Sequence, residues 1–205
     1  MENQAQRLMR KTLSGWVNIR RRQWVSFRCL FTIEIKQVAP RTQWKAIFQD
    51  LSTLVTNGSL VYPKQVVDEL KAGSMARGYD RPYEWAKKNS KHATRHGNLF
   101  SELTEVMSHP TASRVVDPNK SFGVEEADAY VLALAVHLKK NGSSVTVVTE
   151  ESRSTPQKLA LPQACGALRL YTMNVEVFLQ DNGIHPKVAP LLPHTPPKPR
   201  RRKPN

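Results

Sequence analysis

Hydrophobic and polar positions recur at regular helical and strand spacings along most of the chain. Between Trp44 and Val55 the apolar residues recur at helical spacing, and Asn57-Gly58 ends the predicted helix. Residues 59–62 are a short apolar run typical of a buried strand, and the next helix is predicted over residues 63–73. Strand and helix therefore alternate in this part of the chain.

The longest such pattern covers residues 124–151. Asp128 stands at the start of a helix that carries apolar residues on almost every face, which predicts burial on more than one side. A turn at Gly142 leads to residues 145–149, a β-branched strand followed by Glu150 and Glu151. Acids that follow a buried strand are typical of a site at the carboxyl end of a parallel sheet, although solvated loop acids are the alternative.

Further elements are predicted on both sides of this stretch. Residues 27–35 are predicted to form the first strand, and residues 168–172 are predicted to form a later strand. Short helices are predicted at residues 83–88 and 99–107, and Asn174 begins a final helix that Gly183 ends. The alternation predicts an α/β protein, a three-layer α/β/α sandwich with a mostly parallel sheet of about four to five strands.

Charge divides the chain into three parts. The net charge is +14, but residues 1–28 and residues 187–205 contribute +6 each, which leaves the middle almost balanced. We therefore predict a basic, poorly ordered N-terminal extension (residues 1–27), one folded domain (residues 28–184) and a disordered Pro/Arg-rich tail (residues 185–205). Basic ends can contact the phosphates of nucleic acid or simply keep the protein soluble, and both interpretations stay open.

Arginines 20–22 lie between Trp16 and Trp24, an arrangement that could also stack on single-stranded nucleic acid. The alternative, a weakly structured extension, is the prediction retained here.

Two cysteines far apart, no membrane-length apolar run and no secretory signal predict a cytoplasmic protein. His92 and His96 are four residues apart but lack a further ligand nearby, so they indicate a zinc site only weakly.

Neither a glycine-rich phosphate loop nor a nucleophile elbow is present, and acids remain as the candidate chemistry. Ordered motifs then resemble a known family: LVYPKQVVDEL (60–70), ADAYVLALA (127–135), VTVVTEE (145–151) and a closing segment over residues 161–179. Together they resemble the PIN-domain family over residues 33–184. They are most similar to a small bacterial PIN-like group of unknown function, akin to VapC-type toxin ribonucleases.

The resemblance implies a metal-dependent endoribonuclease, and the toxin of a toxin–antitoxin pair is one role that fits it. Carried over by motif, Glu69 matches the family's second acid, Asp128 the third, and Thr149 with Glu151 its Thr-x-Asp element. The implied catalytic residues are Glu69, Asp128 and Glu151, and the implied ligands of Mg²⁺ or Mn²⁺ are these three with Thr149. RNA is the implied partner, and an antitoxin protein and a second copy of the chain are candidate partners that the sequence leaves open.

One departure from the family concerns its first strand, which ends in an Asp that binds the metal. Arg28 falls near that position, and no acid lies between Glu2 and Glu34. An arginine there would oppose metal binding, and the loss of resemblance also fits a diverged or non-native start over residues 1–32, such as a shifted reading frame. Three hypotheses follow: an impaired PIN-like ribonuclease, an inactive PIN-like protein that binds RNA or protein, and an α/β protein without a site.

Overall fold

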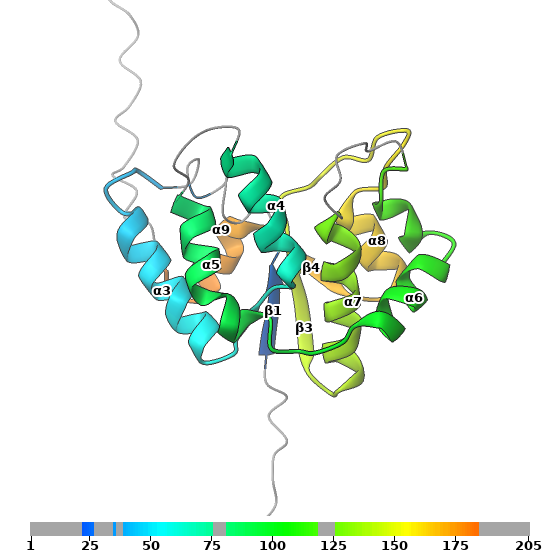
Figure 1. Cartoon of the computed structure of the whole chain (residues 1–205), viewed down its shortest axis with the longest axis horizontal. Helices are drawn as coiled ribbons and strands as arrows, with labels where there is room; N and C mark the ends of the chain where they lie inside the picture. Colours follow the sequence, from blue (N-terminus) through cyan, green and yellow to red (C-terminus); the bar gives the residue numbers. More distant parts are fainter. Residues whose placement is uncertain (1–21, 27–34, 36–38, 76–80, 119–125, 185–205) are drawn as a thin grey trace, which may run out of the picture.

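The protein is an α/β sandwich built on a four-stranded sheet in which all strands are parallel (Figure 1). A computed structural model describes residues 22–26, 35, 39–75, 81–118 and 126–184. In these ranges the elements are β1 Arg22–Ser26, α3 Trp44–Thr56, β2 Leu60–Val61, α4 Lys64–Met75, α5 Arg81–Ala93, α6 Phe100–Ser108, a 3₁₀ turn at Ala112–Val115, α7 Ala127–Lys140, β3 Ser144–Val148, α8 Leu161–Ala167, β4 Tyr171–Met173 and α9 Val175–Asp181.

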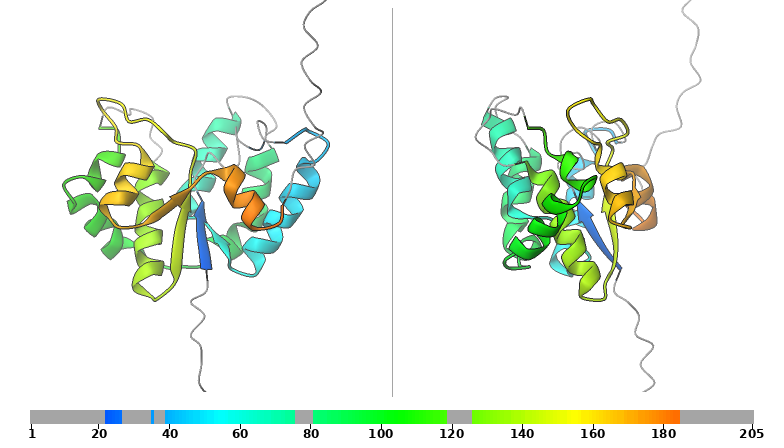
Figure 2. Two further views of the ribbon diagram at one scale, coloured as in Figure 1. Left: turned by 180° about the vertical axis from the view of Figure 1, so that it is seen from behind. Right: turned by 90° about the vertical axis from the view of Figure 1, so that its right-hand side faces the viewer.

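Helices cover both faces of the sheet, which confirms the predicted three-layer architecture (Figure 2). Helices α4, α5, α6 and α7 lie on one face, and α8 with α9 lies on the other. Helix α7 packs against α6 on one side and against β1 and β3 on the other, and ten of its fourteen residues are buried. This position explains why its sequence is apolar almost all round.

The first strand lies earlier in the chain than predicted. β1 occupies the centre of the sheet, in the order β2-β1-β3-β4, and Trp24 and Val25 are buried there. It falls within the segment predicted as an extension, so that boundary is wrong and Trp24 is a core residue. Residues 27–34, where the strand was predicted, lie outside the described residues.

Helices α3 and α5 are joined by a small buried polar network. The Trp85 indole N–H donates to the Phe48 carbonyl (2.7 Å) and to Ser52 Oγ (2.8 Å). The Asn89 amide donates to Ser52 Oγ and to the Trp85 carbonyl. α5 extends beyond the predicted residues 83–88 at both ends, and it can begin at Arg81 because Pro82 stands in its first turn, where no backbone N–H is needed.

The two ends of the chain predicted as disordered lie outside the described residues except for β1. Within the described ranges, no helix combines the length and the apolar character needed to span a membrane. At the carboxyl edge of the sheet, the ends of β1, β2 and β3 lie next to the start of α7, and this edge carries the predicted site.

Candidate carboxylate site

Asp128 is the most deeply buried acid of the site. It lies in the first turn of α7, with its side chain 2% exposed. Its Oδ2 accepts a hydrogen bond from the ammonium of Lys158. Its Oδ1 is also buried and has no hydrogen-bond partner within the described ranges. A buried carboxylate oxygen without a partner is costly, so this atom calls for an explanation.

Lys158 is the centre of the cluster. It comes from the segment between β3 and α8, where its backbone N–H donates to Thr155 Oγ1 (3.0 Å) and its carbonyl accepts from the Thr155 N–H (2.8 Å). Besides Asp128, its Nζ lies 3.7 Å from Glu151 Oε1 and 3.9 Å from Glu126 Oε2. The Lys158 ammonium thus faces three carboxylates: Asp128 in α7, Glu126 just before α7, and Glu151 in the segment after β3.

Glu69 joins α4 to the beginning of α7. Its side chain is buried, and its Oε1 accepts a hydrogen bond from the Ala127 N–H (3.1 Å). The first N–H groups of a helix have no partner within the helix, and the helix dipole favours a negative charge there. Glu69 therefore stabilises the N-terminus of α7, one residue before Asp128.

The acids that follow β3 bind helix N-termini in the same way. Glu151 Oε2 accepts from the Leu161 N–H at the start of α8 (2.8 Å), and Glu150 Oε1 accepts from the Val175 N–H at the start of α9. Thr149 is buried, and its Oγ1 accepts from the Glu151 N–H (3.1 Å), which fixes the turn. Three carboxylates thus link three helix N-termini at this edge of the sheet.

Burial dominates the electrostatics of the site. Burial, together with the carboxylates of Glu151 and Glu69, raises the pKa of Asp128 to about 7, although the Lys158 ammonium opposes this shift. Burial alone would lower the pKa of Lys158, but Asp128, Glu151 and Glu126 outweigh it and raise that pKa. Because one ammonium faces several acids, the cluster keeps negative charge that a further cation could neutralise.

The structure brings Glu69, Asp128 and Glu151 to one region, but it does not point their carboxylates at one common position. Within the described ranges no group of three His, Cys, Asp or Glu side chains is placed to hold one metal ion. The Lys158 ammonium contacts both Asp128 and Glu151, and Glu69 directs an oxygen to Ala127. A metal shared by all three acids therefore stays a prediction, and Arg28 lies outside the described residues.

The histidine pair does not form a ligand set. His92 lies in α5, whereas His96 follows the helix and packs its ring against His137, with centroids 6.4 Å apart. Burial, helped by Arg95 and His137, lowers the pKa of His96, so its ring is neutral at pH 7. These contacts give His96 a packing role.

Cys165 on α8 is expected to be unreactive in the folded protein. Its thiol is fully buried, and burial together with Asp128 raises its pKa to about 12. At pH 8 only about one part in ten thousand is thiolate, the reactive form. In a Cys29→Ser variant, iodoacetamide should label the native protein far more slowly than the urea-unfolded protein, as followed by mass spectrometry. Equal labelling rates would show that the thiol is accessible.

This geometry defines the class of protein. It is a parallel α/β sandwich with a carboxylate cluster at the carboxyl edge of its sheet. The chain belongs to the family described as a domain of unknown function, DUF4411, whose model matches residues 37–185. The match includes the whole carboxylate cluster and begins after β1. No curated protein and no solved structure shows significant similarity to the chain.

Proposed function

We propose that the protein is a PIN-like endoribonuclease that uses Mg²⁺ or Mn²⁺ at the carboxylate cluster. The observation that carries the proposal is the gathering of acids from three segments at one edge of the sheet: Asp128 and Glu151 contact Lys158, and Glu69 binds the N-terminus of α7 next to Asp128. Ligand sites of parallel α/β sheets form at this edge. The buried Asp128 Oδ1, which has no hydrogen-bond partner in the described part of the chain, is a further oxygen available to a cation.

The donor set suits a hard divalent ion. Such ions prefer carboxylate and hydroxyl oxygens, which Asp128, Glu151, Glu69 and Thr149 would supply. When bound, the ion would lower the pKa of a water molecule and neutralise charge on the phosphate. An ion at Asp128 and Glu151 would compete with the Lys158 ammonium, so we expect the affinity to be modest.

The decisive experiment compares Mn²⁺ binding by calorimetry in the wild type and in Asp128→Asn. We expect saturable binding in the wild type and at least about tenfold weaker binding in the variant, because even indirect changes around a metal alter affinity about 10- to 100-fold. Asp50→Asn, which removes an exposed acid on α3, is the matched control and should bind like the wild type. Cleavage of a labelled RNA should follow the same order.

Absence of Mn²⁺ binding in the wild type would contradict the proposal. The second candidate is then an inactive PIN-like protein that binds RNA or a protein such as an antitoxin. The observation that favours it is the ion pair itself, because Lys158 already supplies a positive charge to Asp128. That candidate predicts RNA binding without cleavage, whatever metal is added. Sedimentation of the purified protein would test whether the chain forms the candidate homodimer.

A further inference from the structure

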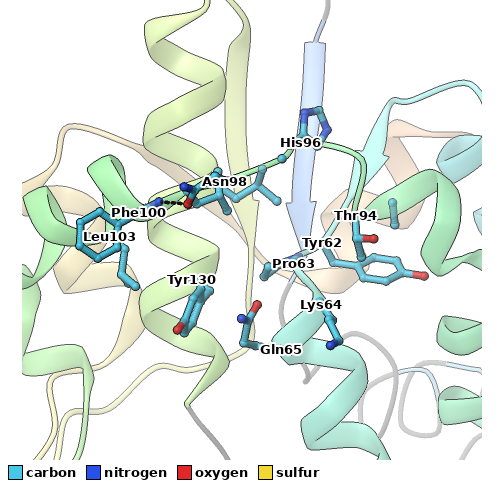
Figure 3. A pocket seen from close by; sticks show the side chains of 14 residues that line it. Tyr62, Pro63, Lys64, Gln65, Thr94, His96, Asn98, Phe100, Leu103 and Tyr130 are labelled. Carbon is cyan, nitrogen blue, oxygen red and sulfur yellow. Dashed lines mark hydrogen bonds between the residues drawn. The ribbon is translucent and has the colours of Figure 1, made fainter.

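A cavity of about 440 Å³ opens between α4, α6 and α7 (Figure 3). Its walls come from the start of α4, the segment after α5, the first turn of α6 and the first turns of α7. Three aromatic rings, two amides and one lysine characterise the lining: Tyr62, Phe100, Tyr130, Gln65, Asn98 and Lys64. Among the residues that the structure describes, no aspartate or glutamate lines it.

Phe100 is the most unusual member of this lining, because it is a large apolar side chain that is 72% exposed. It begins α6, and its backbone N–H donates to Asn98 Oδ1 (2.9 Å), which fixes the turn that presents the ring. In Figure 3 the ring of Tyr130 and the amide of Gln65 lie at the same end of the cavity, on α7 and α4. The Tyr62 hydroxyl donates to the Ala86 carbonyl, so Tyr62 offers the cavity its ring.

The cavity and the carboxylate cluster lie along the same two helices. On α4, Gln65 precedes Glu69 by one turn, a rise of about 6 Å. On α7, Tyr130 follows Asp128 by two residues. The hydrogen bond from Ala127 to Glu69 holds the two helices together at this point. Asp128 and Tyr130 leave α7 on different faces, because they are only two residues apart. The approach to the acids therefore runs along α4, where a polymer in the cavity would reach Glu69 with its neighbouring unit.

We propose that this cavity binds a base of single-stranded RNA, stacked on Phe100 and Tyr130, next to the cluster where the phosphodiester bond would be cut. The inference rests on the proposed function and adds to it the strand type of the substrate and its first recognition site. Aromatic side chains stack on every base, because every base has a π-face. The Gln65 and Asn98 amides can bond base edges, and Lys64 can contact a phosphate.

The charges of the chain favour RNA over an acidic or neutral peptide as the occupant. The described part of the lining carries a lysine and no acid, and the two ends of the chain each carry a surplus of +6. Such ends attract a polyanion without selecting its sequence. The cavity would then contribute a contact with the base in addition to these phosphate contacts.

The test separates base contacts from phosphate contacts. In EDTA, which prevents cleavage, a short fluorescein-labelled oligouridylate is bound to the full chain and displaced by unlabelled oligouridylate or by an abasic ribose-phosphate oligomer of equal length. The wild type should prefer the oligomer with bases by at least about fivefold. Phe100→Ala and Tyr130→Ala should lose this preference, and Phe100→Tyr should retain it.

Tyr171→Ala is the matched control, because Tyr171 on β4 is an aromatic residue 77% exposed outside this cavity. It should keep the wild-type preference, and circular dichroism should show all variants folded. Equal binding of both oligomers by the wild type, or an unchanged preference in Phe100→Ala, would overturn the inference. So would a loss of mass in sedimentation for Phe100→Ala, which would assign the ring to contact between two copies of the chain.

The two proposals fail in different ways. If the cluster is not a nuclease site, Mn²⁺ binding and cleavage are absent, but the preference for bases in EDTA persists. If the cavity does not bind bases, Phe100→Ala leaves the base preference unchanged, while Asp128→Asn still weakens Mn²⁺ binding. Asp128→Asn itself should leave the base preference in EDTA unaltered.

Discussion

Replacement of Lys158 by alanine is expected to lower the free energy of unfolding by about 3 kcal/mol. The substitution removes the ammonium that faces Asp128, Glu151 and Glu126, and leaves these carboxylates close together. The Lys158 side chain is only 24% exposed, so water screens little of the loss. Urea unfolding at neutral pH, followed by circular dichroism, measures the change.

The loss should grow as the pH rises. The pKa of Asp128, about 7 in the folded wild type, lies above its value of about 3.9 in an unfolded chain. A raised acid pKa means that the folded state binds the extra proton, so stability falls as the pH rises through this interval. Without the opposing ammonium the folded pKa rises further, and the deficit of Lys158→Ala should be smaller at pH 5 than at pH 8.

Mn²⁺ should restore part of the stability of Lys158→Ala. An ion that binds only the folded state stabilises it by about 2.7 kcal/mol when its concentration is about one hundred times the dissociation constant. The variant should bind Mn²⁺ more tightly than the wild type, because the competing ammonium is gone. Lys140→Ala removes an exposed lysine paired with Glu105, and should change neither quantity noticeably. If the Lys158→Ala variant is as stable as the wild type and binds Mn²⁺ no more tightly than the wild type, this account is contradicted.

Replacement of Phe178 by alanine should be still more damaging, by about 3 to 5 kcal/mol. Phe178 on α9 is fully buried and meets Trp24 of β1 edge to face, with ring centroids 5.5 Å apart and planes at 74°. The substitution leaves a cavity between the last helix and the central strand and removes the ring contact. Guanidinium unfolding followed by the fluorescence of the four tryptophans, Trp24 among them, measures the change in stability.

The neighbouring residue supplies the control for this prediction. Val177 lies next to Phe178 on α9 and is 41% exposed. Val177→Ala should change the unfolding free energy by less than about 0.5 kcal/mol, because no buried contact is lost. A similar loss in both variants would indicate a weak helix α9, and a loss below about 1 kcal/mol in Phe178→Ala would show that the ring site collapses without a cavity.

Much of the fold was accessible from hydrophobic periodicity and helix end signals. The helix predicted between Trp44 and Val55 is α3, and Gly58 takes the left-handed conformation expected after it, with φ +78°. Asn174 accepts a hydrogen bond from the Val177 N–H at the start of α9, as a helix cap should. These signals act within a few residues, so local sequence determines them.

The first strand could not be located in this way. Its sequence is RQWVS, in which only Trp24 and Val25 are apolar. The polar residues Arg22 and Gln23 come before them, so the strand has no run of apolar residues that would mark it. The run at residues 27–35 has a stronger apolar and β-branched character and was therefore favoured. What makes residues 22–26 a strand is pairing on both sides with β2 and β3, which are distant in the chain. Local propensity carries no information about such pairing.

In the candidate site, too, the features set by local sequence could be predicted and those set by contacts between distant segments could not. Asp128, Glu69 and Glu151 were found because motifs and strand ends single them out, and the structure brings them to one edge of the sheet. Lys158 was missed, since it lies in a polar segment without periodicity, 30 residues after Asp128. The helix-binding roles of Glu69, Glu150 and Glu151 also depend on contacts between distant segments.

The central place of β1 in the sheet has a consequence for biosynthesis. β1 leaves the ribosome first among the strands, yet its neighbour β3 lies roughly 120 residues later. At about 5 to 20 residues per second, the nascent chain would carry an incompletely paired β1 for about 6 to 24 seconds. Pairing over such a separation is also intrinsically slow. Trp24 and Val25 therefore reach their buried positions only after β3 has been synthesised, so the sheet is completed late in synthesis.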